Sequence, residues 1–175
     1  SSRLKKLIED LVEASKASSG SLPVNLQELE VGVLLSQAVG EYQERMEQAD
    51  QTLVLTQPQE PVRILADGRL LWRVFDNLLN NAFKYSQPNT RVYLTLEKIG
   101  NRAVVVFRNI SKVPLNISSD ELMERFVRGD SSRNTEGSGL GLSIAKSLTE
   151  LQGGDFRLIV DGDLFKAMVS FAIID

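Results

Sequence analysis

Cysteine and histidine are both absent from this 175-residue sequence. Without cysteine the chain has no disulfide, no thiolate nucleophile and no thiolate metal ligand. Without histidine it also lacks the side chain that serves most often as a general base and as a nitrogen ligand for metals. Chemistry that depends on either side chain is therefore excluded for this stretch of sequence.

Long apolar runs and basic patches are missing as well. No apolar run approaches the roughly 18 residues that a membrane-spanning helix needs, and no signal-peptide pattern is present. We therefore expect a soluble, cytoplasmic domain. The 20 Lys and Arg residues stand against 23 Asp and Glu residues, which gives a net charge of −3. That balance argues against nucleic acid or an anionic membrane surface as the main partner.

Helical and strand patterns alternate along the chain. Apolar residues three and four apart predict helices, and short apolar or alternating runs bounded by Pro, Gly or Asn predict strands. The expected helices are residues 1–18, 29–48, 67–85 and 121–126, and a last one from 140 to the glycines at 153 and 154. The expected strands are residues 24–26, 52–57, 62–66, 91–98, 103–108, 156–160 and 165–173. With 42% hydrophobic residues, the chain can form one core with room for a short extra element. We expect an α/β two-layer sandwich with its helices on one face.

The first predicted helix already carries an apolar stripe at its beginning. The stripe consists of Leu4, Leu7, Ile8, Leu11 and Val12, with charged residues between them. Such a helix is typical of the cut end of a longer helical hairpin or coiled coil. An ordinary helix that docks on the domain through this stripe is the alternative.

A glycine-rich stretch at residues 136–146 leads from a polar segment into an amphipathic helix. Gly137, Gly139 and Gly141 remove the Cβ atoms that would keep an anion away from backbone N–H groups. The start of the helix then offers unpaired N–H groups and the positive end of its dipole. The spacing fits neither the Walker A motif nor the dinucleotide fingerprint. A phosphate site is one interpretation, and a glycine-rich helix cap is the other.

Three asparagines lie inside the helix predicted for residues 67–85. Asn77, Asn80 and Asn81 are poor helix formers, so their presence within the apolar stripe suggests a role other than helix formation. Asn77, Asn81 and Lys84 are spaced four and then three residues apart and share one face. Amide oxygens suit Mg²⁺, and a lysine one turn further suits a phosphate. A solvated polar face is the alternative.

Three segments together resemble a known family. Residues 76–85 resemble the N box of sensor histidine kinases, residues 124–128 their F box and residues 137–142 their G2 box, in the same order and with similar spacing. The resemblance implies the Bergerat (GHKL) fold, a mixed and mostly antiparallel sheet with helices on one face. It also implies a boundary: residues 1–20 resemble the end of the second dimerisation helix, and residues 21–175 the ATP-binding catalytic domain.

The resemblance implies roles for individual residues. Asn81 would be the principal Mg²⁺ ligand, Asn77 would support the metal and the phosphates, and Lys84 would contact a phosphate. Tyr85 would line the adenine pocket, and Arg128 would meet the phosphates. Residues 127–138 would form a lid over ATP. The residues expected against the triphosphate are Gly137, Ser138, Gly139, Leu140, Gly141 and Leu142.

One expected motif departs from the family pattern. The G1 box of the family is an Asp followed by two spaced glycines at the end of a strand, and the Asp accepts a hydrogen bond from adenine. In this sequence the strand at 103–108 is followed by residues 109–115, which contain no glycine. Asn109 fits the Asp position best. Its amide oxygen can accept that hydrogen bond but carries no charge.

The function implied by the resemblance is that of a bacterial two-component sensor histidine kinase. The chain would bind Mg·ATP and transfer the γ-phosphate to a histidine on a dimerisation domain that this sequence lacks. The implied partners are that domain and a response regulator. The parent protein would be a membrane-anchored homodimer, whereas this fragment would be mostly monomeric. A GHKL protein serine kinase and a degenerate nucleotide-binding scaffold are the alternatives.

Overall fold

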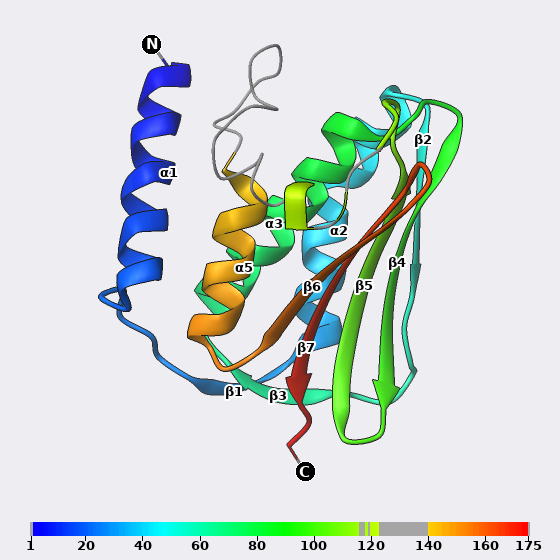
Figure 1. Cartoon of the computed structure of the whole chain (residues 1–175). Coiled ribbons are helices and arrows are strands. Elements are labelled where there is room, and N and C mark those ends of the chain that lie inside the picture. The colour runs from blue at the N-terminus through cyan, green and yellow to red at the C-terminus, as the bar shows by residue number, and fades with distance from the viewer. Residues whose placement is uncertain (1, 116–117, 119, 123–139, 175) are drawn as a thin grey trace.

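The computed structural model describes residues 2–115, 118, 120–122 and 140–174. Figure 1 shows helices stacked against one face of a sheet. The helices are α1 (Ser2–Ser19), α2 (Val31–Gln48), α3 (Gly68–Tyr85) and α5 (Gly141–Leu151). The strands are β1 (Gln27–Glu30), β2 (Gln51–Thr56), β3 (Arg63–Ala66), β4 (Thr90–Ile99), β5 (Arg102–Ile110), β6 (Asp155–Asp161) and β7 (Leu164–Ala172). The expected two-layer α/β architecture is therefore confirmed.

The main sheet has five strands in the order β2-β4-β5-β7-β6. Strand β2 runs parallel to β4, and every other neighbouring pair is antiparallel. The strands expected at 91–98 and 103–108 form one hairpin, β4 with β5, and those expected at 156–160 and 165–173 form another, β6 with β7. Gly100 (φ 61°) and Gly162 (φ 60°) lie in the turns of these hairpins, where a left-handed backbone favours glycine.

The predicted bounds of the first strand and the predicted start of the helix after it are wrong. The strand is Gln27–Glu30 rather than 24–26, and α2 begins at Val31 rather than at 29. Residues 27–30 are extended because they pair with β3 in a separate two-stranded sheet. The expected strands at 52–57 and 62–66 correspond to β2 and β3, but these two strands belong to different sheets. Pairing between distant segments, rather than local periodicity, decided this region.

The core lies between the helices and the inner face of the sheet. Alternate residues of β5 point toward the helices, and Phe107 lies opposite Phe75 of α3 with ring centroids 6.0 Å apart. Leu94 of β4 and Ala167 of β7 flank Phe107 in the sheet register. All four side chains are buried, and apolar burial of this kind is the main favourable contribution to folding.

Helix α3 begins where the sequence predicts. The carboxylate of Asp67 accepts hydrogen bonds from the backbone N–H groups of Arg69 and Leu70 at 3.0 and 3.2 Å. Its second oxygen accepts from the N–H of Asn25 at 2.9 Å. Burial opposes ionisation of Asp67, but these backbone donors and the nearby Arg69 charge lower its pKa. The cap therefore fixes the start of α3 and also ties it to the segment before β1.

Helix α1 packs beside α5 (Figure 1). An ordinary docking helix is expected to turn its apolar stripe toward the domain. The side chains of Leu4, Ile8, Leu11 and Val12 are about half exposed, between 48% and 56%. The residues of α1 that are buried are Asp10 and Ala17. Four of the five residues of the apolar stripe therefore face away from the core, whereas Leu7 is partly buried against it. The cut helical hairpin and the docking helix both stay predictions.

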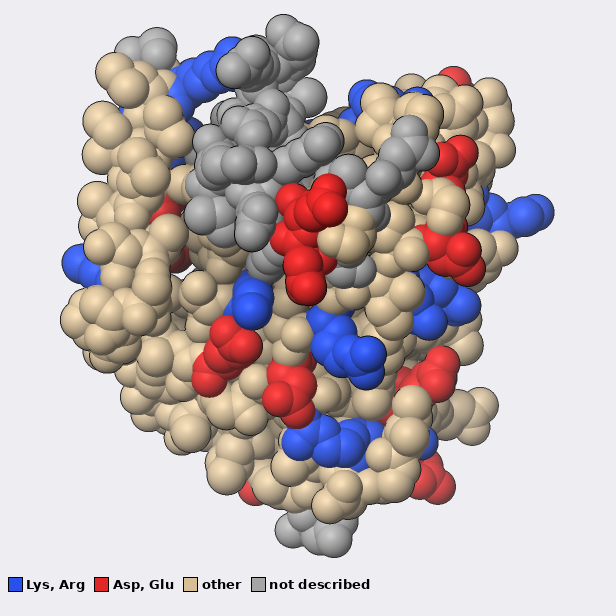
Figure 2. Space-filling view, viewed as in Figure 1, with Lys and Arg blue, Asp and Glu red and all other residues tan. Residues whose placement is uncertain are grey.

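Positive and negative side chains are interspersed over the face of the molecule drawn in Figure 2. No helix among the described residues has both the length and the apolar character that crossing a membrane requires.

Candidate functional site

A pocket of about 310 Å³ opens between α3, α1, α2 and the first turn of α5. The lining residues are Lys6, Asp10, Tyr42, Arg45, Arg73, Asp76, Asn77, Asn80, Asn81, Lys84, Tyr85, Gly141 and Leu142. Six of the predicted site residues lie on its wall: Asn77, Asn81, Lys84, Tyr85, Gly141 and Leu142. The fold thus brings the asparagine face of α3 and the start of the glycine-led helix together.

Asn77 is buried at the centre of this wall, with 7% of its surface exposed. Its Oδ1 atom accepts a hydrogen bond from Nη1 of Arg73 at 3.3 Å. Its Nδ2 atom is buried and has no hydrogen-bond partner in the described part of the chain. A buried donor without an acceptor costs about 1–3 kcal/mol. Asn77 therefore offers an N–H group for which a ligand oxygen is the natural partner.

Asn81 lies one helical turn further along the same wall. It is 8% exposed, and within the described ranges no hydrogen bond engages its side chain. The amide oxygen is thus available to a hard cation such as Mg²⁺, which commonly takes one or two protein oxygens and completes its shell with water and phosphate. No cluster of three or more carboxylate-type or other strong ligands occurs among the described residues. The donor set fits a metal held jointly with a bound phosphate better than a closed protein cage.

The opposite wall is the N-terminus of α5. Leu140 occupies the N-cap position and the first helical residue is Gly141, and no side chain of the described residues caps this end. The first-turn N–H groups and the positive end of the helix dipole therefore suit an anion. Gly141 does not have a positive φ. An added Cβ there would lie 3.9 Å from Asn77, which is ordinary contact, so neither backbone strain nor close packing requires this glycine.

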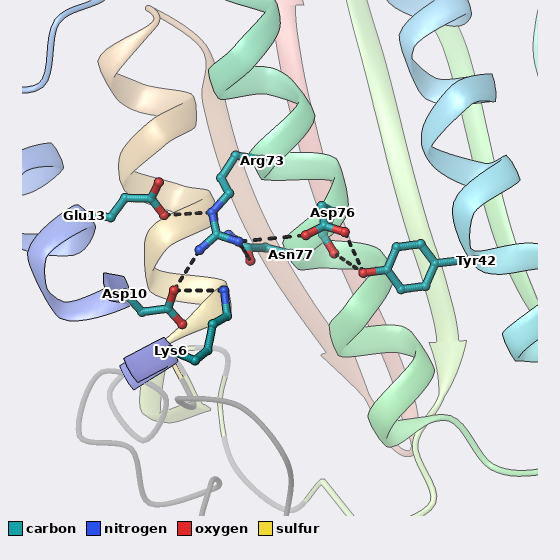
Figure 3. Close-up of polar contacts among 7 residues, drawn as sticks. All are labelled: Lys6, Asp10, Glu13, Tyr42, Arg73, Asp76 and Asn77. Carbon is teal, nitrogen blue, oxygen red and sulfur yellow. Dashed lines mark hydrogen bonds and ion pairs between the residues drawn. The ribbon is translucent and has the colours of Figure 1, made fainter. Parts of the chain in front are cut away.

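Arg73 connects the pocket to helix α1, as Figure 3 shows. Its Nη2 atom lies 2.8 Å from Oδ1 of Asp10 and its Nε atom lies 2.8 Å from Oε1 of Glu13. A third carboxylate, that of Asp76, lies 3.8 Å from Nη1. Burial opposes the charged guanidinium, but Glu13, Asp10 and Asp76 outweigh burial and raise the pKa of Arg73. The guanidinium is therefore held between α1 and the asparagine face of α3.

Tyr42 of α2 supports the same helix from the other side. Its hydroxyl donates to the carboxylate of Asp76 at 2.6 Å (Figure 3). Burial, and then the hydrogen bond to Asp76, raises the pKa of Tyr42. The guanidinium of Arg45 lies 4.2 Å from the centre of the Tyr42 ring. Asp76 is thus fixed at the pocket edge by a tyrosine that stays protonated at neutral pH.

Asn109 does not line this pocket, but the end of its strand meets the end of α3. Asn109 follows Phe107 in the inward-facing alternation of β5 and is buried. Just after Asn109 in the chain, the carbonyl of Ile110 accepts a hydrogen bond from the N–H of Gln87 at 2.8 Å. The N–H of Lys112 donates to the carbonyl of Tyr85, also at 2.8 Å. The position expected to meet adenine therefore lies on a strand that is anchored beside Tyr85.

Several predicted residues lie outside the described part of the chain. These are Arg128, Gly137, Ser138 and Gly139, together with most of the expected short helix and all of the F box and lid.

Local sequence patterns do not single out Arg73, Asp76, Tyr42 or the α1 residues of the pocket. Arg73 precedes Asn77 by four residues, so the helical spacing that grouped the asparagines also places Arg73 on their face. No local pattern indicates that Asp10 approaches Arg73, since the two residues are 63 positions apart.

Comparison with known proteins agrees with this geometry. The family model described as histidine kinase-, DNA gyrase B- and HSP90-like ATPase matches residues 66–169. The probable sensor protein PcoS of Escherichia coli is 33% identical over 157 residues, which are 87% of this chain and 33% of that protein. The chain therefore spans about a third of the length of this relative.

Solved structures share the fold. Full-length ShkA in complex with AMPPNP superposes with a TM-score of 0.81 at 22% identity, covering 98% of this chain and 36% of that one. Histidine kinase ThkA in complex with the response regulator protein TrrA superposes with a TM-score of 0.75 at 20% identity, covering 99% of this chain and 48% of that one. The chain belongs to the family of histidine kinase-, DNA gyrase B- and HSP90-like ATPases, and the similar proteins named above are a sensor protein and histidine kinases.

Proposed function

We propose that this domain binds Mg·ATP in the pocket between α3 and α5 and serves transfer of the γ-phosphate to a histidine on a separate dimerisation domain. The observation that carries the proposal is the convergence on one pocket of three groups that have no side-chain partner among the described residues. They are the buried Nδ2 of Asn77, the side chain of Asn81 and the start of α5. Together they offer donors for phosphate oxygens and an oxygen for a cation.

The two asparagines would divide the work. The Oδ1 atom of Asn77 is engaged by Arg73, which leaves the Nδ2 donor for a phosphate oxygen. Asn81 would therefore be the principal Mg²⁺ ligand, and Asn77 would support metal binding through the phosphate. A bound Mg²⁺ ion neutralises charge on the phosphates. The protein's contribution is to hold the phosphates in a fixed orientation and to exclude water.

Other residues would position the nucleotide. The first N–H groups of α5, at Gly141 and Leu142, would face the phosphates, and Lys84 would add a positive charge at the other end of the pocket. Tyr85 and Asn109 would meet the adenine, the first by packing and the second by accepting a hydrogen bond. Leu140 of the G2 box would also lie against the phosphates. Arg128, Gly137, Ser138 and Gly139, which would contact the phosphates, and the lid at 127–138, which would cover ATP, lie outside the described residues.

The remaining partners follow from the family. Residues 1–20 would be the end of the second dimerisation helix and residues 21–175 the catalytic domain. The exposed stripe of α1 supports this division, because apolar residues that face away from the domain can pack against a further helix. A response regulator would accept the phosphate from the histidine, since the ThkA structure contains such a protein.

One observation favours a second candidate, a nucleotide-binding scaffold without turnover. Asn109 is buried and neutral at the position where the family has a carboxylate. Because a charged acceptor is worth more than a neutral one by about 1 kcal/mol, adenine binding would be weakened. Good Mg·ATP binding without phosphate transfer would favour this candidate.

The test combines calorimetric titration with a transfer assay. Wild type should bind Mg·ATP, and should pass labelled phosphate to a separately prepared hairpin that carries the acceptor histidine. Asn81→Ala should abolish Mg²⁺-dependent binding while leaving the fold intact, since alanine is the better helix former. Gln43→Ala is the matched control, because Gln43 is an exposed amide in α2. Wild-type affinity in the Asn81→Ala variant would contradict the metal assignment.

A further inference from the structure

Arg73 shares the pocket wall with the residues proposed to bind Mg·ATP, yet the proposed function gives it no contact with the nucleotide. Arg73, Asn77, Asn81 and Lys84 are spaced four, four and three residues apart along α3, and all four line the pocket. This spacing places them on one face of the helix. A guanidinium at this position is within the site rather than beside it.

All three guanidinium nitrogens are engaged in the described structure. Nε faces Glu13 and Nη2 faces Asp10, each at 2.8 Å, and Nη1 donates to Asn77 at 3.3 Å (Figure 3). Two of these three acceptors belong to α1. The planar fork of arginine binds carboxylate and phosphate in the same geometry, so one guanidinium edge cannot serve both at once.

Asp10 adds a second obstacle to an anionic ligand. Its side chain is only 5% exposed and lines the pocket, where its negative charge faces the space proposed for the triphosphate. Lys6, four residues earlier, lies 3.1 Å from the same carboxylate oxygen but is 44% exposed, so solvent screens its charge more strongly. Docked α1 therefore both occupies Arg73 and brings a carboxylate to the site.

We propose that Arg73 is a phosphate-binding residue that docked α1 covers, so that Asp10 and Glu13 compete with the triphosphate of the nucleotide for its guanidinium. The proposal rests on the proposed function of the pocket. When α1 moves away, two carboxylates leave and Arg73 keeps only its contacts within α3, with Asn77 and Asp76. Its Nε and Nη2 groups are then free for phosphate oxygens.

The remaining contacts of α1 make such a movement accessible. Ala17 is the only apolar side chain that α1 buries fully within its described length, and Leu7 and Ala14 are partly buried. A helix with so little apolar burial opens at a lower free energy than the core does. By linkage, nucleotide must weaken α1 docking by the same factor as α1 docking weakens nucleotide binding.

The test uses the full chain and two matched charge removals on α1. Glu13→Gln removes a carboxylate that contacts Arg73, and Glu9→Gln removes an exposed carboxylate on the same helix. Calorimetric titration with Mg·ATP and with Mg·tripolyphosphate should show roughly fivefold tighter binding for Glu13→Gln, at the lower end of typical coupling between sites. Glu9→Gln should bind as wild type does. Equal affinities of the two variants would overturn the proposal.

A second substitution separates phosphate binding from a structural role of Arg73. Arg73→Gln should weaken binding more strongly when added to Glu13→Gln than when made in wild type, because the guanidinium is available only in the first background. Equal losses in both backgrounds would mean that Arg73 does not bind phosphate. Hydrogen exchange adds a direct reading: saturating Mg·ATP should speed exchange of α1 amides in wild type, and slower or unchanged exchange would refute the competition.

The outcomes separate this inference from the proposed function. If neither wild type nor any variant binds Mg·ATP, the proposed function fails and the competition fails with it. If wild type binds and Asn81→Ala does not, but Glu13→Gln matches Glu9→Gln, the proposed function stands and only the competition is refuted.

Discussion

The two sides of helix α3 are held by opposite kinds of contact. Toward the sheet, α3 presents Phe75 and other apolar side chains to an inner face that includes Phe107. Toward α1, it presents Arg73, which contacts Asp10 and Glu13. The first contact buries apolar surface, and the second pairs the buried Asp10 and the partly exposed Glu13 with the partly exposed Arg73.

These two kinds of contact respond differently to a bound ligand. Apolar burial is not weakened by charge screening and is lost only when the fold opens. Charge pairs are weakened by salt and can exchange one anionic partner for another. The sheet side of α3 is thus a fixed support for the asparagine face, whereas the α1 side is a contact that another anion can replace.

The largest effect is expected on the sheet side. Phe75→Ala should destabilise the fold by about 3–5 kcal/mol, because it removes a fully buried ring and leaves a cavity opposite Phe107. Chemical denaturation followed by circular dichroism measures the change. A loss below about 1 kcal/mol would show that the ring does not carry the core contact described here.

The next effect concerns the cap that fixes α3. Asp67→Ala should cost about 1–2 kcal/mol, because it leaves the N–H groups of Arg69 and Leu70 without their acceptor. The pKa of Asp67 is lowered in the folded state, so its stabilisation is present above the unfolded pKa of about 3.9. It is lost as the pH falls through the folded-state value.

Denaturation of wild type, Asp67→Ala and Asp67→Asn at neutral and at acidic pH tests the cap. Asparagine also caps helices but does not titrate, so Asp67→Asn should lose less stability on acidification than wild type does. Equal losses in these two proteins would remove Asp67 from the acid response.

A smaller effect is expected on the α1 side. Raising the salt concentration from about 0.1 M to about 1 M shortens the screening length from roughly 10 Å to 3 Å. Amide exchange in α1 should then speed up, while exchange in α3 stays nearly unchanged, since the contacts of Arg73 with Asp10 and Glu13 are ionic. Uniform behaviour of both helices would mean that α1 is part of the apolar core.

The smallest effect is expected on the outer face of α1. Ile8→Lys and Leu11→Lys should each change the stability of this chain by less than about 0.5 kcal/mol, because both side chains are about half exposed, at 52% and 51%. Thermal unfolding of the single variants measures this. A loss of several kcal/mol would place the stripe in a packed interface of this chain.

The elements that depend on local chemistry could be predicted from the sequence. The two hairpins follow from alternating strands around turns that contain Gly100 and Gly162, and α3 follows from its 3.6-residue period and from the cap at Asp67. The asparagine face could also be predicted, because helical spacing alone places Asn77 and Asn81 on the same face of α3. Each of these features depends on residues within a few positions of one another.

How distant segments of the chain meet could not be predicted from local patterns and is known from the structure alone. The pairing of β1 with β3, the parallel approach of β2 to β4 and the face that α1 turns to the domain each require partners far apart in the chain. The same holds for Arg73, whose ion pair with Asp10 joins residues 63 positions apart. Periodicity indicates which residues share a face. What that face meets is set by packing, because a hydrogen bond or an ion pair exists only where the fold brings both of its partners together.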